Sequence, residues 1–122
     1  MGGIYRNTRE YDLAYNLIIG AAARRQIIRY TELAPLVGLK RSGNHMGNEI
    51  GRLLREICEN EHRAGRPLLS SIVVNSSGKP GPGYFEYARS LGKLPADGDE
   101  KEFWESEKEA VHTCWSASLN LG

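Results

Sequence analysis

The sequence lacks long apolar runs and contains few cysteines. Its longest apolar runs, such as Leu17–Ile19 and Ile72–Val74, fall far short of the roughly 20 residues that span a bilayer. No basic segment leads into an apolar stretch at the N-terminus, so we expect no secretory signal. Two cysteines, Cys58 and Cys114, do not make a disulfide framework. We therefore expect a soluble, cytoplasmic protein with reduced thiols and no membrane partner.

The 122 residues suffice for one hydrophobic core but not for two. Hydrophobic residues make up 40% of the chain and charged residues 25%, which is typical of a globular domain rather than of a disordered one. We expect a winged-helix domain over residues 1–93, a linker over 94–99, and an acidic C-terminal helix over 100–122 that packs on the same domain.

The net charge of +1 conceals an asymmetry. Residues 1–93 carry fourteen lysines and arginines against eight acidic residues, whereas residues 94–122 carry two against seven. The basic part can attract phosphate. The acidic part either restrains binding to phosphate or serves only as a solvated helix.

The apolar spacing predicts three helices in the first half of the chain. Helical periodicity covers residues 8–24, where Asn7 offers a cap and Glu10 completes a capping box. Thr31 caps a short second helix that ends before Gly38. Ser42 caps a longer third helix that runs to about residue 64.

The second half predicts strands and a closing helix. Residues 68–74 read as a strand, and the turn formers of residues 75–83 follow it. Residues 84–89 either resume as a strand or begin a helix, and residues 100–117 form a final amphipathic helix. This order indicates an α+β fold of the winged helix-turn-helix type, with three N-terminal helices, a β-hairpin wing and a C-terminal amphipathic helix.

The start of the third predicted helix carries candidates for DNA binding, because a recognition helix contacts base edges from its N-terminal residues. Polar side chains that can bond to bases or phosphates are Ser42, Asn44, His45 and Asn48. Lys40 and Arg41 lie just before them, where phosphate contacts would fix the register. Alternatively, these polar residues only cap and solvate the helix.

Three glycines, Gly43, Gly47 and Gly51, share one face of the same helix. Each costs up to about 1 kcal/mol relative to alanine inside a helix. Either a neighbouring helix packs closely against this face, or nucleic acid approaches it.

The sequence patterns for a metal site or a catalytic site are weaker. Two histidines and two cysteines form a nominal zinc set, namely Cys58, His62, His112 and Cys114. His112 and Cys114 are two residues apart and point away from each other on a helix, so we expect no metal. Neither a nucleophile–base pair nor a phosphate-binding loop is recognisable, so we expect no enzyme activity and no cofactor. The predicted wing, which contains Lys79, either follows a DNA groove or is an inert connection.

Residues 26–84 resemble the DNA-binding domain of alkylguanine-DNA alkyltransferases and their non-catalytic alkyltransferase-like relatives. Residues 27–34 look like the segment that opens the helix-turn-helix of that family, and residues 69–74 fall on its Pro-Cys-His-Arg-Val active-site strand. The loop Asn75-Ser76-Ser77-Gly78 resembles the loop that follows that strand. The resemblance covers about half of the chain and implies a winged-helix fold.

The resemblance also assigns residues. Tyr30 matches a tyrosine that helps to rotate the target nucleotide out of the duplex. Asn44 stands in place of the arginine that fills the gap in the base stack. Ser70 replaces the alkyl-accepting cysteine and Ser71 the adjacent histidine, which argues against alkyl transfer because a serine without a base is a poor nucleophile. The third helix is longer than that of the family.

We therefore expect a non-catalytic duplex-DNA-binding protein of winged-helix type, related to the alkyltransferase-like proteins. The predicted DNA-binding residues are Tyr30, Thr31, Lys40, Arg41, Ser42, Asn44, His45, Asn48, Arg52, Ser70 and Lys79. Recognition of a damaged or flipped base, through Tyr30 and Ser70, is a narrower form of this hypothesis.

A protein-interaction or adaptor module, in a DNA-processing or restriction-type system, is the alternative. Phe103, Trp104 and Trp115 on the C-terminal helix would anchor a partner or a homodimer. The same aromatic residues would otherwise close the core of this domain.

Overall fold

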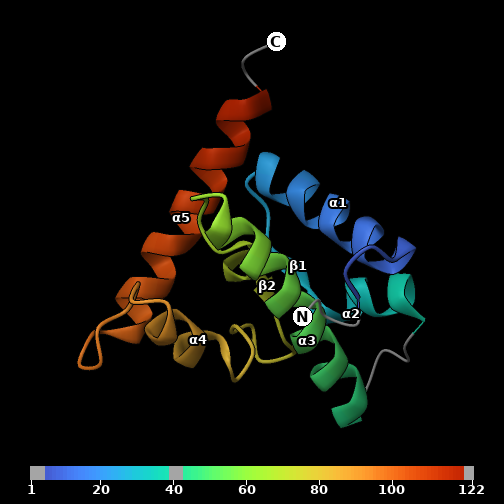
Figure 1. Ribbon diagram of the computed structural model, residues 1–122, viewed down its shortest axis with the longest axis horizontal. Helices are drawn as coiled ribbons and strands as arrows, with labels where there is room; N and C mark the ends of the chain where they lie inside the picture. Colours follow the sequence, from blue (N-terminus) through green and yellow to red (C-terminus); the bar gives the residue numbers. More distant parts are fainter. Residues whose placement is uncertain (1–4, 39–42, 120–122) are drawn as a thin grey trace.

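The computed structural model describes residues 5–38 and 43–119, which form an α-rich α+β structure (Figure 1). The first half contains α1 (Arg9–Ala23), β1 (Ile28–Arg29), α2 (Tyr30–Leu33), the 3-10 helix η1 (Ala34–Val37) and α3 (Gly43–Arg63). The second half contains the 3-10 helix η2 (Leu69–Ile72), β2 (Val73–Val74), α4 (Tyr84–Ser90) and α5 (Glu100–Leu119). The expected order of helix, short helix and longer helix is therefore present.

Two predicted helix caps are wrong by one or two residues. Thr8 rather than Asn7 caps α1, because its hydroxyl accepts the Tyr11 N–H at 3.2 Å while Asn7 adopts a left-handed φ of 67°. Thr31 lies inside α2, which begins at Tyr30 after the N-cap Arg29. The Glu32 carboxylate accepts the Arg29 N–H at 2.8 Å and fixes this earlier start. Tyr30 is consequently the first residue of a helix.

The predicted β-hairpin wing is wrong. β1 pairs with β2 in parallel, with Ile28 opposite Val73 and Arg29 opposite Val74. Residues 69–72 form η2 rather than the first part of a strand, and the chain after β2 turns at Asn75 and enters α4. The segment at 84–89 thus takes the helical alternative, and the part of the chain that the structure describes contains no antiparallel strand pair.

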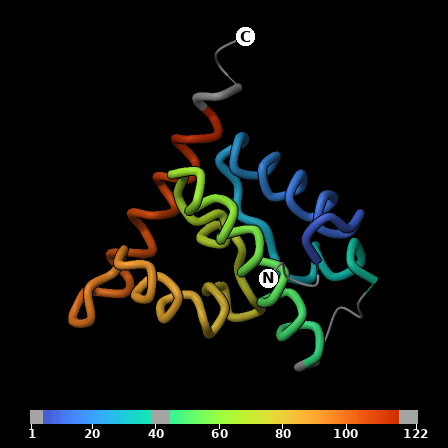
Figure 2. Tube along the Cα trace, viewed as in Figure 1, coloured from blue at the N-terminus to red at the C-terminus, as the bar shows by residue number. Residues whose placement is uncertain are grey.

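The core lies between α1, α3, η2 and α5. In Figure 2 the C-terminal end of α1 meets α5, against which it packs, and α3 crosses in front of η2 and β2. Trp115 packs against the main apolar cluster, and Phe103 and Trp104 pack against a second cluster around Tyr84, Tyr87 and Leu68. The aromatic side chains of α5 therefore contact the core of this chain. None of the described helices combines the length and the hydropathy needed to cross a membrane.

Buried carboxylates tie the connecting segments to this core. Glu61 is fully buried, accepts two hydrogen bonds from the Arg66 guanidinium at 2.8 and 2.9 Å, and accepts a third from the Tyr15 hydroxyl. This carboxylate raises the pKa of Arg66. Glu56 accepts the backbone N–H groups of Tyr5 and Arg6 and holds the N-terminal segment against α3. The buried carboxylates of α3 thus join it to α1, to the segment before α1 and to the loop after α3.

Candidate nucleic-acid interface

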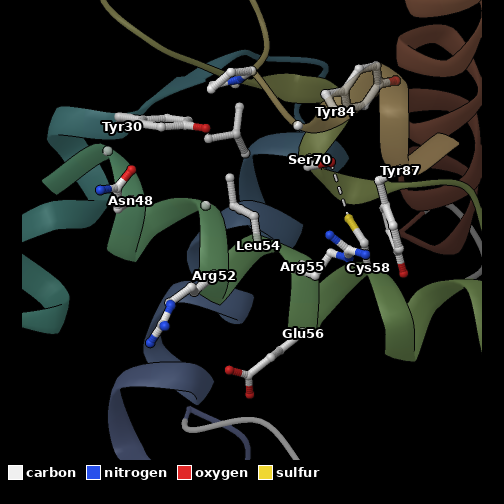
Figure 3. A pocket seen from close by; sticks show the side chains of 16 residues that line it. Tyr30, Asn48, Arg52, Leu54, Arg55, Glu56, Cys58, Ser70, Tyr84 and Tyr87 are labelled. Atoms are coloured by element: carbon white, nitrogen blue, oxygen red, sulfur yellow. Dashed lines mark hydrogen bonds between the residues drawn. The ribbon is translucent and has the colours of Figure 1, made fainter. Parts of the chain in front are cut away.

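A cavity of about 530 Å³ opens between α3 and the segment that leads into α4 (Figure 3). Tyr30 forms one side wall, and Tyr84 and Tyr87 form the opposite wall. Ser70 and Cys58 lie at its base. The remaining lining residues are Gly47, Asn48, Gly51, Arg52, Leu54, Arg55, Glu56, Val73, Gly81, Pro82 and Gly83. Three tyrosine rings and several glycines thus surround one concave site.

Two of the α3 glycines widen this cavity. A methyl group built at Gly47 or Gly51 would meet no atom within 4 Å, so neither glycine is required by a helix packed against it. Of the two alternatives, close packing by a neighbouring helix therefore does not hold at Gly47 or Gly51, and the surroundings of Gly43 lie outside the described part of the chain. Each glycine carries a helix-propensity cost of up to about 1 kcal/mol that internal packing does not explain.

Close packing against Tyr30 explains why residue 81, in the loop before α4, is a glycine. A methyl group at this position would lie 2.1 Å from the Tyr30 hydroxyl oxygen and 3.3 Å from the ring carbon that bears it. The Tyr30 side chain, only 5% exposed, therefore fits beneath the backbone of the loop. Its burial raises the pKa of the phenol, so the hydroxyl stays protonated at neutral pH.

We expect Gly81→Ala to lower the free energy of unfolding by about 1–3 kcal/mol because of this overlap. The double variant Tyr30→Phe/Gly81→Ala removes the clashing oxygen and should recover most of the loss. Urea unfolding of the wild type, both single variants and the double variant measures this coupling. Additive losses would show that the hydroxyl and the loop do not contact each other.

Two side chains at the base of the cavity, Cys58 and Ser70, contact each other. The Cys58 thiol donates a hydrogen bond to the Ser70 hydroxyl oxygen at 3.2 Å. Burial raises the pKa of Cys58 to about 11, so the thiol stays protonated at neutral pH and is a poor nucleophile. No described residue places a base beside Ser70.

Ser71 does not line the cavity. It is buried behind the cavity, where it joins η2 to α4 and α5. Its hydroxyl lies 2.6 Å from the Tyr84 hydroxyl, and its carbonyl oxygen accepts the Trp104 indole N–H at 2.9 Å. Burial raises the pKa of Tyr84 as well. The wall that Tyr84 provides is thus held by η2 and α5.

One face of α3 is polar and exposed along its length. At intervals of three or four residues it presents His45, Asn48, Arg52, Arg55, Glu59 and His62, and it ends at Arg63, four residues after Glu59. We call this set the α3 stripe. Over eighteen steps of about 1.5 Å it is about 27 Å long. It carries three arginines and a single carboxylate, so its charge is positive.

The stripe meets the cavity at Arg55. The Arg55 guanidinium lies 4.1 Å from the centre of the Tyr87 ring, so a cation stands over one aromatic wall. Arg52 contributes to the rim, and its guanidinium points away from the cavity in Figure 3. Arg52 lies 3.9 Å from Glu49, a weak pair because the contact is long and the Arg52 side chain is 63% exposed.

The predicted DNA-binding residues divide into three groups. Tyr30, Asn48, Arg52 and Ser70 gather at the cavity, and His45 lies on the adjoining stripe. Thr31 is half-buried in α2, and Lys79 is exposed in the turn after β2. Lys40, Arg41 and Ser42 lie outside the described residues, as does the side chain of Asn44.

Sequence analysis missed Arg55, Tyr84 and Tyr87. Arg55 follows Asn48 and Arg52 at seven and three residues, so helical spacing from the predicted residues would have found it. The two tyrosines carry no such signal, because their place at the cavity depends on the return of α4 toward α3.

The acidic residues of α5 are partly neutralised within the chain. Glu100 pairs with Arg89 at 2.8 Å and Glu109 pairs with Arg25 at 2.9 Å. Glu107 accepts the Leu68 N–H and pairs with Lys93 at 3.1 Å. Restraint of DNA binding by this helix stays a prediction, as does a protein partner or homodimer at Phe103, Trp104 and Trp115.

No protein-family model, no curated protein and no solved structure matches this chain.

Proposed function

We propose that this chain is a non-catalytic duplex-DNA-binding protein that holds a base turned out of the duplex. The α3 stripe contacts the DNA, and the cavity beside it receives the base. The observation that carries the proposal is the opening of an aromatic-walled cavity directly beside an exposed row of arginines. Two residues of that cavity, Tyr30 and Ser70, are those that the resemblance to alkyltransferase-like proteins assigns to the nucleotide.

The dimensions and chemistry of the site support this proposal. A volume of about 530 Å³ lies within the range of small-molecule sites, roughly 300–1,000 Å³. Flipped bases are held by stacking on aromatic side chains and by hydrogen bonds to their edges. Tyr30, Tyr84 and Tyr87 offer rings, and Ser70 and Asn48 offer hydrogen-bonding groups.

The charge of the α3 stripe supports the DNA contact. Arginines neutralise phosphates and release counterions, which supplies much of the affinity of a DNA-binding protein. In this proposal α2, η1 and α3 act as a helix-turn-helix, and the turn that carries Lys79 reaches the sugar–phosphate backbone. Catalysis is not included, because burial keeps the Cys58 thiol protonated and none of the described residues places a base beside Ser70.

The first test is a titration of fluorescent duplex DNA at low and at physiological salt, followed by anisotropy. We expect binding at low salt and a logarithm of the affinity that falls linearly with the logarithm of the salt concentration. Absence of binding at both salt concentrations would refute the proposal.

The second test separates base eversion from general DNA binding. Matched duplexes contain a normal base pair, a mismatched pair or an alkylated guanine. We expect tighter binding to the mismatched and alkylated duplexes, because a weakened pair costs less to open. Equal affinity for all three would leave only general DNA binding.

Replacing two glycines of α3 by alanine is expected to raise the stability of the protein and to weaken its binding to DNA. We expect Gly47→Ala/Gly51→Ala to raise the free energy of unfolding by about 1–2 kcal/mol, because alanine favours a helix and neither methyl group meets another atom. The same methyl groups narrow the cavity, so we expect weaker binding to the mismatched duplex. Urea unfolding and duplex titration of one preparation measure both effects. Unchanged binding would show that DNA does not approach this face.

A further inference from the structure

A second, smaller cavity lies beyond Tyr87 at the C-terminal half of α3. It measures about 360 Å³ and is lined by Arg6, Glu59, His62, Arg63, Tyr87 and Leu91. Tyr87 also lines the first cavity, so the two cavities share one wall. Glu59, His62 and Arg63 belong to the α3 stripe. The stripe therefore connects the two concave sites along one helix face.

The charged groups of this second cavity are incompletely paired. Arg6 Nη2 is buried and has no hydrogen-bond partner within the described ranges, while its ion pair with Glu59 spans 3.6 Å. The Arg63 side chain is exposed and makes neither an ion pair nor a hydrogen bond with any residue that the structure describes. Two guanidinium groups thus face a single carboxylate, and a buried donor lacks an acceptor. An oxyanion in the cavity would accept hydrogen bonds from the exposed Arg63 guanidinium and would balance the excess positive charge.

We propose that this second cavity binds a phosphate group, supplied by the DNA strand that runs along the α3 stripe. The Arg63 guanidinium donates hydrogen bonds to the phosphate oxygens, Arg6 adds a positive charge to the wall, and His62 adds a ring nitrogen at the edge. The Glu59 carboxylate repels the anion and therefore turns outward when the phosphate binds. Arg63 follows Arg52 by eleven residues, or about 16 Å along α3, so the phosphate lies several nucleotides away from the everted base.

This inference rests on the proposed function for the source of the phosphate. It adds an anchor that the resemblance does not supply, because the N-terminal segment, α4 and the lengthened end of α3 build it together. Glu56 positions that segment by accepting the Arg6 N–H at 2.8 Å. The anchor therefore depends on features particular to this chain.

The test compares duplex binding by three variants of the full chain across a range of salt concentrations. Arg63→Ala should weaken binding about tenfold and lower the salt slope by about one. Glu59→Gln should tighten binding a few-fold, because it removes the one opposing charge. Arg24→Ala is the matched control, since Arg24 lies at the C-terminal end of α1 and its side chain hydrogen-bonds, among the described residues, to Gln26 in its own loop. It should change the affinity less than twofold.

A second arm uses sodium phosphate alone and does not depend on DNA binding. We expect phosphate to shift the NMR resonances of Arg6, His62 and Arg63 in the wild type and to leave Arg63→Ala almost unchanged. If the wild type binds duplex and Arg63→Ala matches it in affinity and salt slope, the inference is overturned and the proposed function stands. If the wild type binds no duplex, the proposed function fails, and the phosphate titration alone then decides whether this cavity is an anion site. Shifts at the three residues would support the site, and their absence would overturn it.

Discussion

Replacing both cavity-side arginines of the stripe, Arg52→Ala/Arg55→Ala, is expected to weaken duplex binding by about two orders of magnitude. A hydrogen bond to a charged group contributes about 1.5–3 kcal/mol, and 1.4 kcal/mol corresponds to about tenfold in affinity. The salt slope should fall by about two, one for each lost phosphate contact. The loss should be nearly the same for all duplex sequences, because phosphate contacts carry no sequence information. Anisotropy titrations at several salt concentrations measure both quantities.

Arg24→Ala/Arg25→Ala is the charge-matched control for this variant. It removes the same two positive charges from the end of α1, where Arg25 pairs with Glu109 on α5. If the two double variants lose affinity equally, binding depends on net charge and not on the α3 stripe. Because Arg55 also stacks on Tyr87, urea unfolding of each variant must show that the fold is retained.

The second large effect concerns stability. We expect Arg66→Ala to lower the free energy of unfolding by about 3 kcal/mol, because the fully buried Glu61 carboxylate loses its countercharge. This value is at the lower end of the range for buried pairs, since the Arg66 side chain is 37% exposed and water screens it. Urea unfolding with a shared slope measures the change.

Arg63→Ala is the matched control, because Arg63 is a nearby arginine at the end of α3 without an ion pair to any described residue. It should change the stability by no more than about 0.5 kcal/mol. Glu61→Gln/Arg66→Ala replaces the buried charge by a neutral amide and should be more stable than Arg66→Ala alone. A double variant as unstable as Arg66→Ala would show that the buried charge is not the cause.

The helices were predictable from the sequence because their signals are local. Periodic apolar residues placed α1, α3 and α5 within a few residues of their observed bounds, and Gly38 and Gly65 adopt the left-handed φ values expected at helix ends. The predicted β-hairpin, in contrast, is wrong. Pro80 and Pro82 lack N–H donors and cannot continue an antiparallel ladder. Buried Tyr84, Tyr87 and Ala88 are spaced as on a helix, and this pattern outweighs the β propensity of the aromatic residues.

The site was only partly predictable for a related reason. Tyr30, Asn48, Arg52 and Ser70 come from three segments, and the parallel pairing of β1 with β2 brings Tyr30 and Ser70 to one cavity. That pairing joins residues about 45 positions apart, and no local signal sets its register. Likewise, no local signal in the sequence shows that open space lies beside Gly47 and Gly51.

The most direct measurement for the α3 stripe and its cavity is NMR mapping of duplex binding. Isotope-labelled protein is titrated with a mismatched duplex at low salt, and the shift of each backbone amide is followed. We expect the largest shifts at His45, Asn48, Arg52 and Arg55, with further shifts at Tyr30 and Tyr87, and little change on the exposed face of α5. Shifts confined to α1 or α5, or none at saturating duplex, would contradict the assignment of this face to DNA.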